Sequence, residues 1–337
     1  MKASRTGIMA AAGLWLLLGT SCGAGTGDSA KAQNRTETAV SITSNMRERP
    51  VPEGYAPDGT YLFAEKDGEQ LFLDIYEPEQ VSEGKPTLIY VFGGGFVGGA
   101  RNEDRLMPFF SALNDSGYRV VAIDYRLGLK GKGKIGIGTV NNLDWAIHMA
   151  VEDLFDATAF MIENSAELGI DCSNLVLVGS SAGAITSLQA EYEICNGSRY
   201  ASALPQGFNY KGVVSLAGAV LSRDGALKYT SEPCPMLLLH GTKDDVVNYG
   251  QTKFFKLGWY GSDKIASVCR KNGYSYGIYR FEGAKHEIAN SGLVNLAVID
   301  DFIRTNVMES GHRTIDALVL DPRIEVSTLT LDELYGE

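Results

Sequence analysis

The sequence has few of the residues that metal sites and nucleic-acid surfaces require. Its 337 residues include four histidines and five cysteines, and neither a Cys-x-x-Cys nor a His-x-x-x-His spacing occurs. A metal ion would therefore lack a recognisable set of ligands. With 41 acidic against 30 basic residues, the formal net charge is −11, which does not favour binding to nucleic acid. We therefore expect no metal, no cofactor and no nucleic-acid partner.

The sequence also lacks an apolar run long enough to span a bilayer. Its apolar run Ile8–Leu18 follows two basic residues and has the length of a signal-peptide core. The segment Leu18-Gly19-Thr20-Ser21-Cys22 resembles a bacterial lipoprotein signal, in which the cysteine is lipidated. An ordinary cleaved signal peptide is the alternative, because Gly19 replaces the usual Leu or Val. Either reading predicts export, and the first predicts a periplasmic or outer-membrane-anchored lipoprotein that contacts the membrane only through Cys22.

The next segment contains little that could form a core. Residues 22–48 are mostly small or polar, which predicts a flexible tether after a signal peptide at 1–21. Export permits disulfides, and the four cysteines beyond Cys22 allow three pairings that the sequence does not distinguish. Unpaired buried thiols are the alternative. These four cysteines are Cys172, Cys195, Cys234 and Cys269.

Apolar runs then alternate with helical patterns over a predicted catalytic domain at 49–308. Two runs with a period of two, Tyr61–Phe63 and Leu71–Tyr76, predict a leading antiparallel hairpin. Continuous apolar runs separated by helices predict a mostly parallel sheet with helices on both faces, the α/β class. The tail at 309–337 has one apolar stretch, Ile315–Leu320, and no assigned role. The apolar runs are Thr87–Phe92, Val120–Ile123, Leu175–Val178, Gly212–Leu216, Met236–Leu239 and Tyr274–Phe281, and the helical patterns are Glu103–Asp115, Asn142–Leu168, Ala184–Ile194 and Leu293–Met308.

One of these strands leads directly into a Gly-x-Ser-x-Gly motif. The run Leu175–Val178 is followed by Gly179-Ser180-Ser181-Ala182-Gly183 and then by a helical stretch. This is the strand–turn–helix context of a nucleophile elbow. The turn is sharp enough to strain the serine backbone and to press strand and helix together, which explains the flanking glycines. Ser181 is therefore the candidate nucleophile.

A serine nucleophile needs an imidazole base and a carboxylate that orients it. Asp244 follows the predicted strand Met236–Leu239, and His286 lies in a loop after the strand that ends at Phe281. We assign them as the carboxylate and the base, since they complete the order Ser, Asp, His. The neighbouring Asp245 is the alternative carboxylate. The other three histidines, His148, His240 and His312, are expected to be structural or exposed.

A glycine-rich loop follows the first buried strand. The segment Phe92-Gly93-Gly94-Gly95-Phe96 can approach a substrate and point its amides at an oxyanion. A phosphate-binding loop is disfavoured because no Lys-Ser/Thr pair follows, as it would in a P-loop.

Together these motifs resemble the α/β-hydrolase superfamily over about residues 55–308, and within it the hormone-sensitive-lipase and type-B carboxylesterases. The resemblance implies the α/β-hydrolase fold and a Ser181–His286–Asp244 triad. It assigns the oxyanion hole to the amides of Gly94, Gly95 and Ala182. It also makes Asp124-Tyr125-Arg126 a structural turn. Phe92 stands where the lipase-like branch has His, so the subfamily stays open.

The expected activity is that of a serine esterase that cleaves carboxylic esters through an acyl-enzyme. A short-acyl, carbohydrate or phenolic ester is the expected substrate, since no apolar lid segment is present. A serine peptidase of the same fold and a catalytically inactive binding module are the alternatives. Two insertions, 127–140 and 195–210, are predicted to wall the pocket, with Trp259 and Tyr260 near the alcohol half. Lys130, Lys132 and Lys134 in the first insertion either meet an acidic substrate group or are solvated.

Overall fold

The computed structural model describes residues 50–80, 82–132 and 140–320, all within one compact unit of the chain. The predicted signal peptide, the tether and Cys22 lie outside the described residues. None of the helices in the described ranges is long and apolar enough to cross a membrane.

A nine-stranded sheet with the order β1-β2-β4-β3-β5-β6-β8-β11-β12 organises the fold. The predicted hairpin β1–β2 is antiparallel, and β2 is also antiparallel to β4. Every other neighbouring pair in this sheet is parallel. The prediction of a mostly parallel sheet is therefore confirmed. The strands are β1 (Gly59–Lys66), β2 (Glu69–Tyr76), β3 (Thr87–Val91), β4 (Val120–Ile123), β5 (Leu175–Ser180), β6 (Gly212–Leu216), β8 (Met236–Gly241), β11 (Tyr276–Phe281) and β12 (Thr314–Val319).

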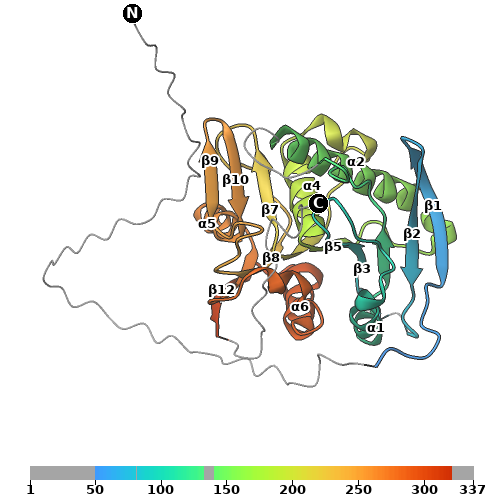
Figure 1. Ribbon diagram of the computed structural model, residues 1–337. Coiled ribbons are helices and arrows are strands. Elements are labelled where there is room, and N and C mark those ends of the chain that lie inside the picture. Colours follow the sequence, from blue (N-terminus) through green and yellow to red (C-terminus); the bar gives the residue numbers. More distant parts are fainter. Residues whose placement is uncertain (1–49, 81, 133–139, 321–337) are drawn as a thin grey trace, which may run out of the picture. The chain divides into compact units, whose positions relative to one another are not determined.

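Helices cover both faces of this sheet, as the alternation of apolar runs predicts. In Figure 1, α1 and α6 lie below the sheet, and α2 and α4 lie above it. The central strands β3, β4, β5, β6 and β8 are buried along their whole length, which explains their continuous apolar sequences. The α-helices are α1 (Met107–Asp115), α2 (Val140–Glu163), α3 (Ser165–Leu168), α4 (Ala182–Cys195), α5 (Ser262–Asn272) and α6 (Leu296–Phe302), which continues as a π-helix over Ile303–Met308.

A second, three-stranded sheet was not predicted from the sequence. Its order is β7-β10-β9, with β7 (Ala219–Ser222), β9 (Gln251–Phe254) and β10 (Leu257–Gly261) all antiparallel. Tyr260 on β10 is fully buried, so it does not form part of a substrate surface as the sequence suggested.

The tail contributes a strand to the main sheet, so the predicted domain boundary at residue 308 is wrong. β12 pairs in parallel with β11, and Asp316 of β12 accepts a 2.6 Å hydrogen bond from Arg280 of β11. Its residues alternate between exposed and half-buried, as expected of an edge strand. Such a short strand with a charged residue at its centre gives only a weak sequence signal. The catalytic domain extends at least to Val319.

The insertion at 195–210 does not lie at the catalytic edge, so its prediction as a pocket wall is also wrong. Helix α4 begins directly after Ser181 and has 14 residues, which places its end about 21 Å along the axis from that serine. The segment then leads into the amino end of β6. The error arose because the helix carries the chain back across the sheet.

The other insertion is described only in part, because residues 133–139, including Lys134, lie outside the described ranges. The amide of Leu129 donates to the carbonyl of Phe96, so this segment contacts the glycine-rich loop. The ammonium of Lys132 lies 5.6 Å from the centroid of the Trp145 ring.

The four described cysteines are unpaired. Cys195, Cys234 and Cys269 are buried and Cys172 is partly buried. Of the two expectations for these residues, the structure favours free thiols.

Candidate active site

The Gly-x-Ser-x-Gly motif forms a strained turn between β5 and α4. Ser181 has φ 49° and ψ −115°, a conformation that non-glycine residues rarely adopt. A Cβ on Gly179 would lie 2.4 Å from the carbonyl oxygen of Gly183, and one on Gly183 would lie 2.0 Å from that of Val91. Both contacts are too close for any side chain, so the two glycines are required for strand and helix to approach.

The structure brings Ser181, His286 and Asp244 together in one hydrogen-bonded chain. Their positions follow from the parallel sheet, because Ser181, Asp244 and His286 follow the carboxyl ends of β5, β8 and β11. Ser181 Oγ lies 2.8 Å from His286 Nε2, and His286 Nδ1 lies 2.8 Å from Asp244 Oδ2. A carboxylate only accepts, so Nδ1 carries the proton and Nε2 is left to accept from the serine. All three residues are buried.

Asp244 is held in its charged form. Its Oδ1 accepts hydrogen bonds of 2.9 Å from the amides of Val246 and Val247. Burial alone raises the pKa of the Asp244 carboxyl, but hydrogen bonds and charge interactions with His240 and His286 outweigh it and hold the pKa well below the usual range. The alternative carboxylate, Asp245, pairs instead with Lys285 at 3.2 Å on the exposed side of the loop. Of the two, Asp244 is the one that faces His286.

His240 is a fully buried neighbour of this carboxylate, a contact that the sequence analysis missed. Its Nε2 lies 2.9 Å from the carbonyl oxygen of Val247 and 3.2 Å from Asp244 Oδ2. A carbonyl can only accept, so Nε2 carries the proton, and Nδ1 accepts from the Ser262 hydroxyl at 2.8 Å. His240 thus contacts the same carboxylate oxygen, Oδ2, that accepts from His286. The sequence signal for this contact was the position of His240 at the end of β8, four residues before Asp244.

The glycine-rich loop after β3 bends toward the serine. Gly94 and Gly95 have positive φ angles of 134° and 63°, and Gly94 accepts hydrogen bonds from the amides of Val97 and Gly98. Ala182 is the first residue of α4, where helix amides lack an intrahelical partner. Within the described ranges, no acceptor is bonded to the amides of Gly94, Gly95 or Ala182. These three amides are the candidate oxyanion donors.

Phe92 supports this loop by packing. The ring is buried and stacks on Tyr125 with 4.3 Å between centroids, and the Tyr125 hydroxyl donates to the Phe92 carbonyl at 2.9 Å. The predicted turn Asp124-Tyr125-Arg126 is itself fixed, since Arg126 pairs with the buried Asp153 at 2.8 Å. Arg101 at the far end of the loop pairs with Asp74 and Asp124. The loop is therefore tied to the sheet at both ends.

A cavity of about 390 Å³, a volume within the usual range of small-molecule pockets, is lined by neighbours of Ser181 and His286 and not by the triad residues themselves. It is lined by Leu216, whose carbonyl accepts from the Ser181 amide, and by Glu287, the residue after His286. Its other walls come from the start of α1 and the segment after His286. The remaining lining residues are Tyr90, Arg105, Leu106, Pro108, Phe109, Ala289, Asn290, Ser291, Gly292, Leu293 and Val294.

In the part of the chain that the structure describes, no three His, Cys, Asp or Glu side chains are grouped as metal ligands.

Comparison with known proteins agrees with this geometry. The family described as BD-FAE matches residues 73–219, which include the glycine-rich loop and the Ser181 turn. Among solved structures, native esterase 2 of Thermogutta terrifontis superimposes with a TM-score of 0.53 at 20% identity, over 79% of this chain and 95% of that one. The chain has the α/β-hydrolase fold, so the prediction of the fold is confirmed. The family match and the esterase neighbours support the predicted resemblance to carboxylesterases with this fold.

The curated relatives of this α/β-hydrolase include esterases and peptidases. Ethyl acetate hydrolase of Pseudomonas putida is 31% identical over 120 residues, which are 35% of this chain and 33% of that protein. Dipeptidyl peptidase 8 of Mus musculus is 29% identical over 224 residues, 60% of this chain and 24% of that one. The chain thus spans a third or less of the length of each.

Proposed function

We propose that this α/β-hydrolase cleaves carboxylic esters through an acyl-enzyme on Ser181. The observation on which the proposal rests is the hydrogen-bonded chain from Ser181 through His286 to Asp244, placed on a strained turn beside unbonded amides. The similarity to esterases supports the reaction class.

In the proposed mechanism, Ser181 Oγ attacks the carbonyl carbon of the ester while His286 Nε2 takes the hydroxyl proton. The oxyanion is stabilised by the amides of Gly94, Gly95 and Ala182, a kind of contribution worth about 10²- to 10³-fold per donor. His286 then protonates the leaving alcohol, and the C–O bond breaks. Water, deprotonated by the same imidazole, then attacks the acyl carbon. His286 returns that proton to Ser181 Oγ as the bond between the acyl carbon and Oγ breaks, which releases the acid and restores the free enzyme. Asp244 keeps Nδ1 protonated and stabilises the imidazolium in both halves.

We further propose that the substrate carries a short acyl group and that its alcohol half is a sugar or a phenol. The activity named for the ethyl acetate hydrolase supports the short acyl group. The cavity beside Leu216 and Glu287 is the candidate pocket. The test is kcat/KM on aryl esters from acetate to decanoate and then on acetylated and feruloylated oligosaccharides. A maximum at long acyl chains would refute the short-acyl proposal, and inactivity on every glycan ester would refute the carbohydrate one.

A serine peptidase is the second candidate, because dipeptidyl peptidase 8 aligns over a longer stretch than the ethyl acetate hydrolase does. Parallel assays of aryl esters and peptide anilides separate the two activities. We expect ester turnover to dominate. Predominant cleavage of the anilides would reverse the assignment, and no turnover of either would favour an inactive binding module.

We also propose that the protein is exported and anchored through lipidated Cys22, a residue outside the described ranges. The basis is the Leu18–Cys22 segment and the apolar run before it. Cys22→Ala is expected to release soluble, active enzyme. Metabolic labelling with a palmitate analogue tests the anchor directly, and an unlabelled wild-type band would rule it out.

A further inference from the structure

The β9–β10 hairpin ends in two exposed phenylalanines. It is the orange pair of strands at the upper left of Figure 1, on the opposite side of the view from β1 and β2. Phe254 is 61% and Phe255 is 89% exposed, and Phe255 has the largest exposed fraction of any large apolar residue in the described ranges. Lysines flank the pair, so the tip reads Lys253-Phe254-Phe255-Lys256. Adjacent exposed aromatic rings indicate a contact surface more often than isolated ones do.

The backbone conformation of Phe255 at the tip is one that folding alone does not favour for a phenylalanine. Leu257 pairs with Phe254, so the hairpin is closed by a two-residue turn, Phe255-Lys256. Phe255 has φ +53°, the first central position of a type II′ turn, where glycine is the usual residue. The Lys256 carbonyl accepts a hydrogen bond from Gly225, which fixes the tip to the loop after β7. A strained, solvent-exposed phenylalanine on a supported turn is evidence for a role in binding.

The arrangement of the two rings limits what can bind there. Their centroids are 4.7 Å apart and their planes are at 85°, so they form a wedge and not the flat platform on which a sugar ring stacks. Two phenyl side chains bury roughly 300–500 Å². A stable dimer needs about 1,200 Å² or more. A bilayer requires neither a flat surface nor a minimum contact area, because binding to it increases with the apolar area inserted and with attraction to anionic lipids.

We propose that the tip Lys253–Lys256 inserts into the interface of a membrane that contains acidic lipids. The two phenyl rings enter the acyl region, and the two ammonium groups remain among the phosphates. These lysines provide charge complementarity to the lipid surface in a protein whose net charge is −11. The contact is independent of the catalytic proposal and of acylation at Cys22. With a second anchor it orients the enzyme on the surface, since one weak signal alone gives reversible binding.

The test uses the full chain with Cys22→Ala, so that acyl chains do not contribute, and adds Phe255→Trp as a probe of the tip. We expect its fluorescence to shift to the blue and to be quenched by brominated phosphatidylcholine in phosphatidylcholine–phosphatidylglycerol vesicles, beyond any change in the protein without the probe. The double variant Phe254→Ser/Phe255→Ser is expected to partition at least about tenfold less. Lys253→Gln/Lys256→Gln is expected to lower binding roughly tenfold on acidic vesicles and not on pure phosphatidylcholine.

Leu62→Ser is the matched control, because Leu62 is a 44%-exposed apolar residue on β1. In Figure 1, β1 and the β9–β10 hairpin lie on opposite sides of the view. It is expected to leave vesicle binding unchanged, and ester hydrolysis by every tip variant is expected to match wild type, which reports correct folding. An unquenched, unshifted Phe255→Trp signal would overturn the proposal. So would a wild-type dimer in sedimentation that Phe254→Ser/Phe255→Ser dissociates, since the tip would then bind a second copy.

Discussion

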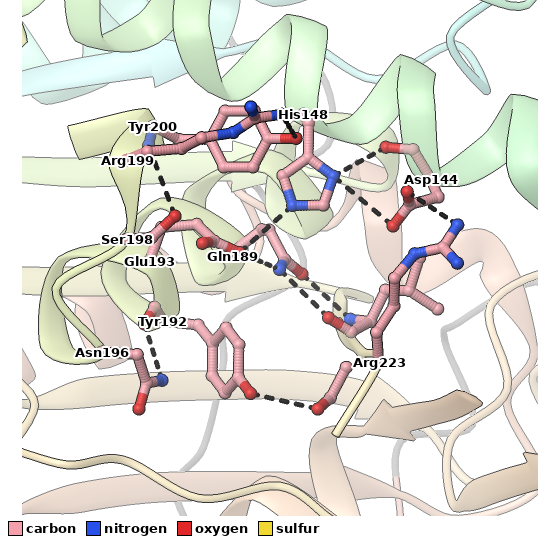
Figure 2. A network of polar contacts seen from close by, with 12 residues as sticks. Asp144, His148, Gln189, Tyr192, Glu193, Asn196, Ser198, Arg199, Tyr200 and Arg223 are labelled. Carbon is pink, nitrogen blue, oxygen red and sulfur yellow. Dashed lines mark hydrogen bonds and ion pairs between the residues drawn. The ribbon is translucent and has the colours of Figure 1, made fainter. Parts of the chain in front are cut away.

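Two histidine networks in this protein, one buried and one partly buried, look alike but differ in what the imidazole faces. In the first, His286 lies between the carboxylate of Asp244 and the hydroxyl of Ser181. Figure 2 shows the second, in which His148 of α2 lies between Glu193 of α4 and the backbone of Asp144. His148 Nε2 is 3.2 Å from Glu193 Oε1, and Nδ1 is 2.8 Å from the Asp144 carbonyl oxygen.

The second network stabilises the protonated, positively charged form of His148. Burial lowers the pKa of the His148 imidazole, but hydrogen bonds to Glu193 and Asp144 outweigh that effect and raise it. Tyr200 stacks on the ring with 4.3 Å between centroids, and Gln189 donates to Glu193 at 2.7 Å. Both ring nitrogens of His148 face acceptors, so the protonated form is favoured.

The difference shows that a histidine beside a carboxylate is not enough for catalysis. His286 can work as a base because one nitrogen faces a hydroxyl and is free to accept its proton. The hydroxyl belongs to a strained residue next to unbonded amides. In the described part of the chain, the ring nitrogens of His148 face only acceptors on Asp144 and Glu193. Substitutions in the two networks should therefore have very different effects on ester hydrolysis.

The largest expected effect comes from removing the reacting groups. Ser181→Ala and His286→Ala are each expected to lower kcat by about 10⁴-fold or more, because the two side chains act as one unit. His148→Gln keeps a polar side chain in the second network and is expected to stay within about threefold of wild type. Steady-state kinetics on an aryl acetate measures all three, with circular dichroism as the folding control. A His148→Gln variant as inactive as His286→Ala would remove the distinction between the networks.

The carboxylate assignment predicts the next largest effect. Asp244→Asn leaves His286 Nδ1 without a charged acceptor, and we expect a loss of about 10³- to 10⁴-fold in kcat. Asp245→Asn is the matched control, since its carboxylate pairs only with Lys285 among the described ion pairs. It is expected to remain within about twofold of wild type. If Asp245→Asn proved the more damaging, the assignment of Asp244 would be wrong.

The oxyanion loop predicts a smaller but still large effect. Gly94 has φ 134°, and a Cβ on it would lie 2.1 Å from the carbonyl oxygen of Gly98. Gly94→Val is therefore expected to displace the Gly94 amide and to lower kcat by about 10²- to 10³-fold. Phe92→His keeps a flat ring against Tyr125 and is expected to stay within about tenfold of wild type. A folded but inactive Phe92→His enzyme would show that this side chain does more than pack.

The smallest effect concerns stability in the second network. The raised pKa of His148 stabilises the fold fully below the ordinary histidine value near 6.5, and the effect is lost as the pH rises through the raised value. Burial raises the pKa of Glu193, but hydrogen bonds led by His148 lower it overall, so its contribution is lost as the pH falls below the ordinary value near 4.3.

His148→Gln is therefore expected to lower Tm by about 2–4 °C between about pH 4.5 and 6.5, and by less at higher pH. Thermal unfolding of wild type and variant across pH measures the difference. A Tm difference that grows from pH 6.5 to 9 would contradict the assigned protonation state.

Most of the candidate site could be predicted because each of its residues is marked by the residues next to it in the sequence. The glycines around Ser181 report a turn whose geometry leaves no room for a side chain, and the positions of Asp244 and His286 follow from the ends of buried strands. The contact between His240 and Asp244 could not be predicted, since it depends on how the segment after β8 folds back on itself. The sequence places His240 at a strand end but does not show which way its ring points.

The misplaced parts of the fold have a common cause. Whether β12 joins the sheet depends on which strand it pairs with, and the position of residues 195–210 depends on the direction in which α4 crosses the sheet. The local sequence encodes neither. The small sheet was missed because β9 is fully exposed and has no apolar pattern. Such strands are identified by their partners and not by their own residues.

The most direct test of the central proposal is to identify the residue that a fluorophosphonate modifies. The reagent reacts with a serine that an adjacent base activates, so intact mass and peptide mapping locate the nucleophile. We predict a single adduct on Ser181 that forms at the rate at which esterase activity is lost, is absent in Ser181→Ala, and forms at the wild-type rate in His148→Gln. An enzyme that loses activity with the adduct on another residue, or that hydrolyses esters while Ser181 stays unmodified, would contradict the proposal.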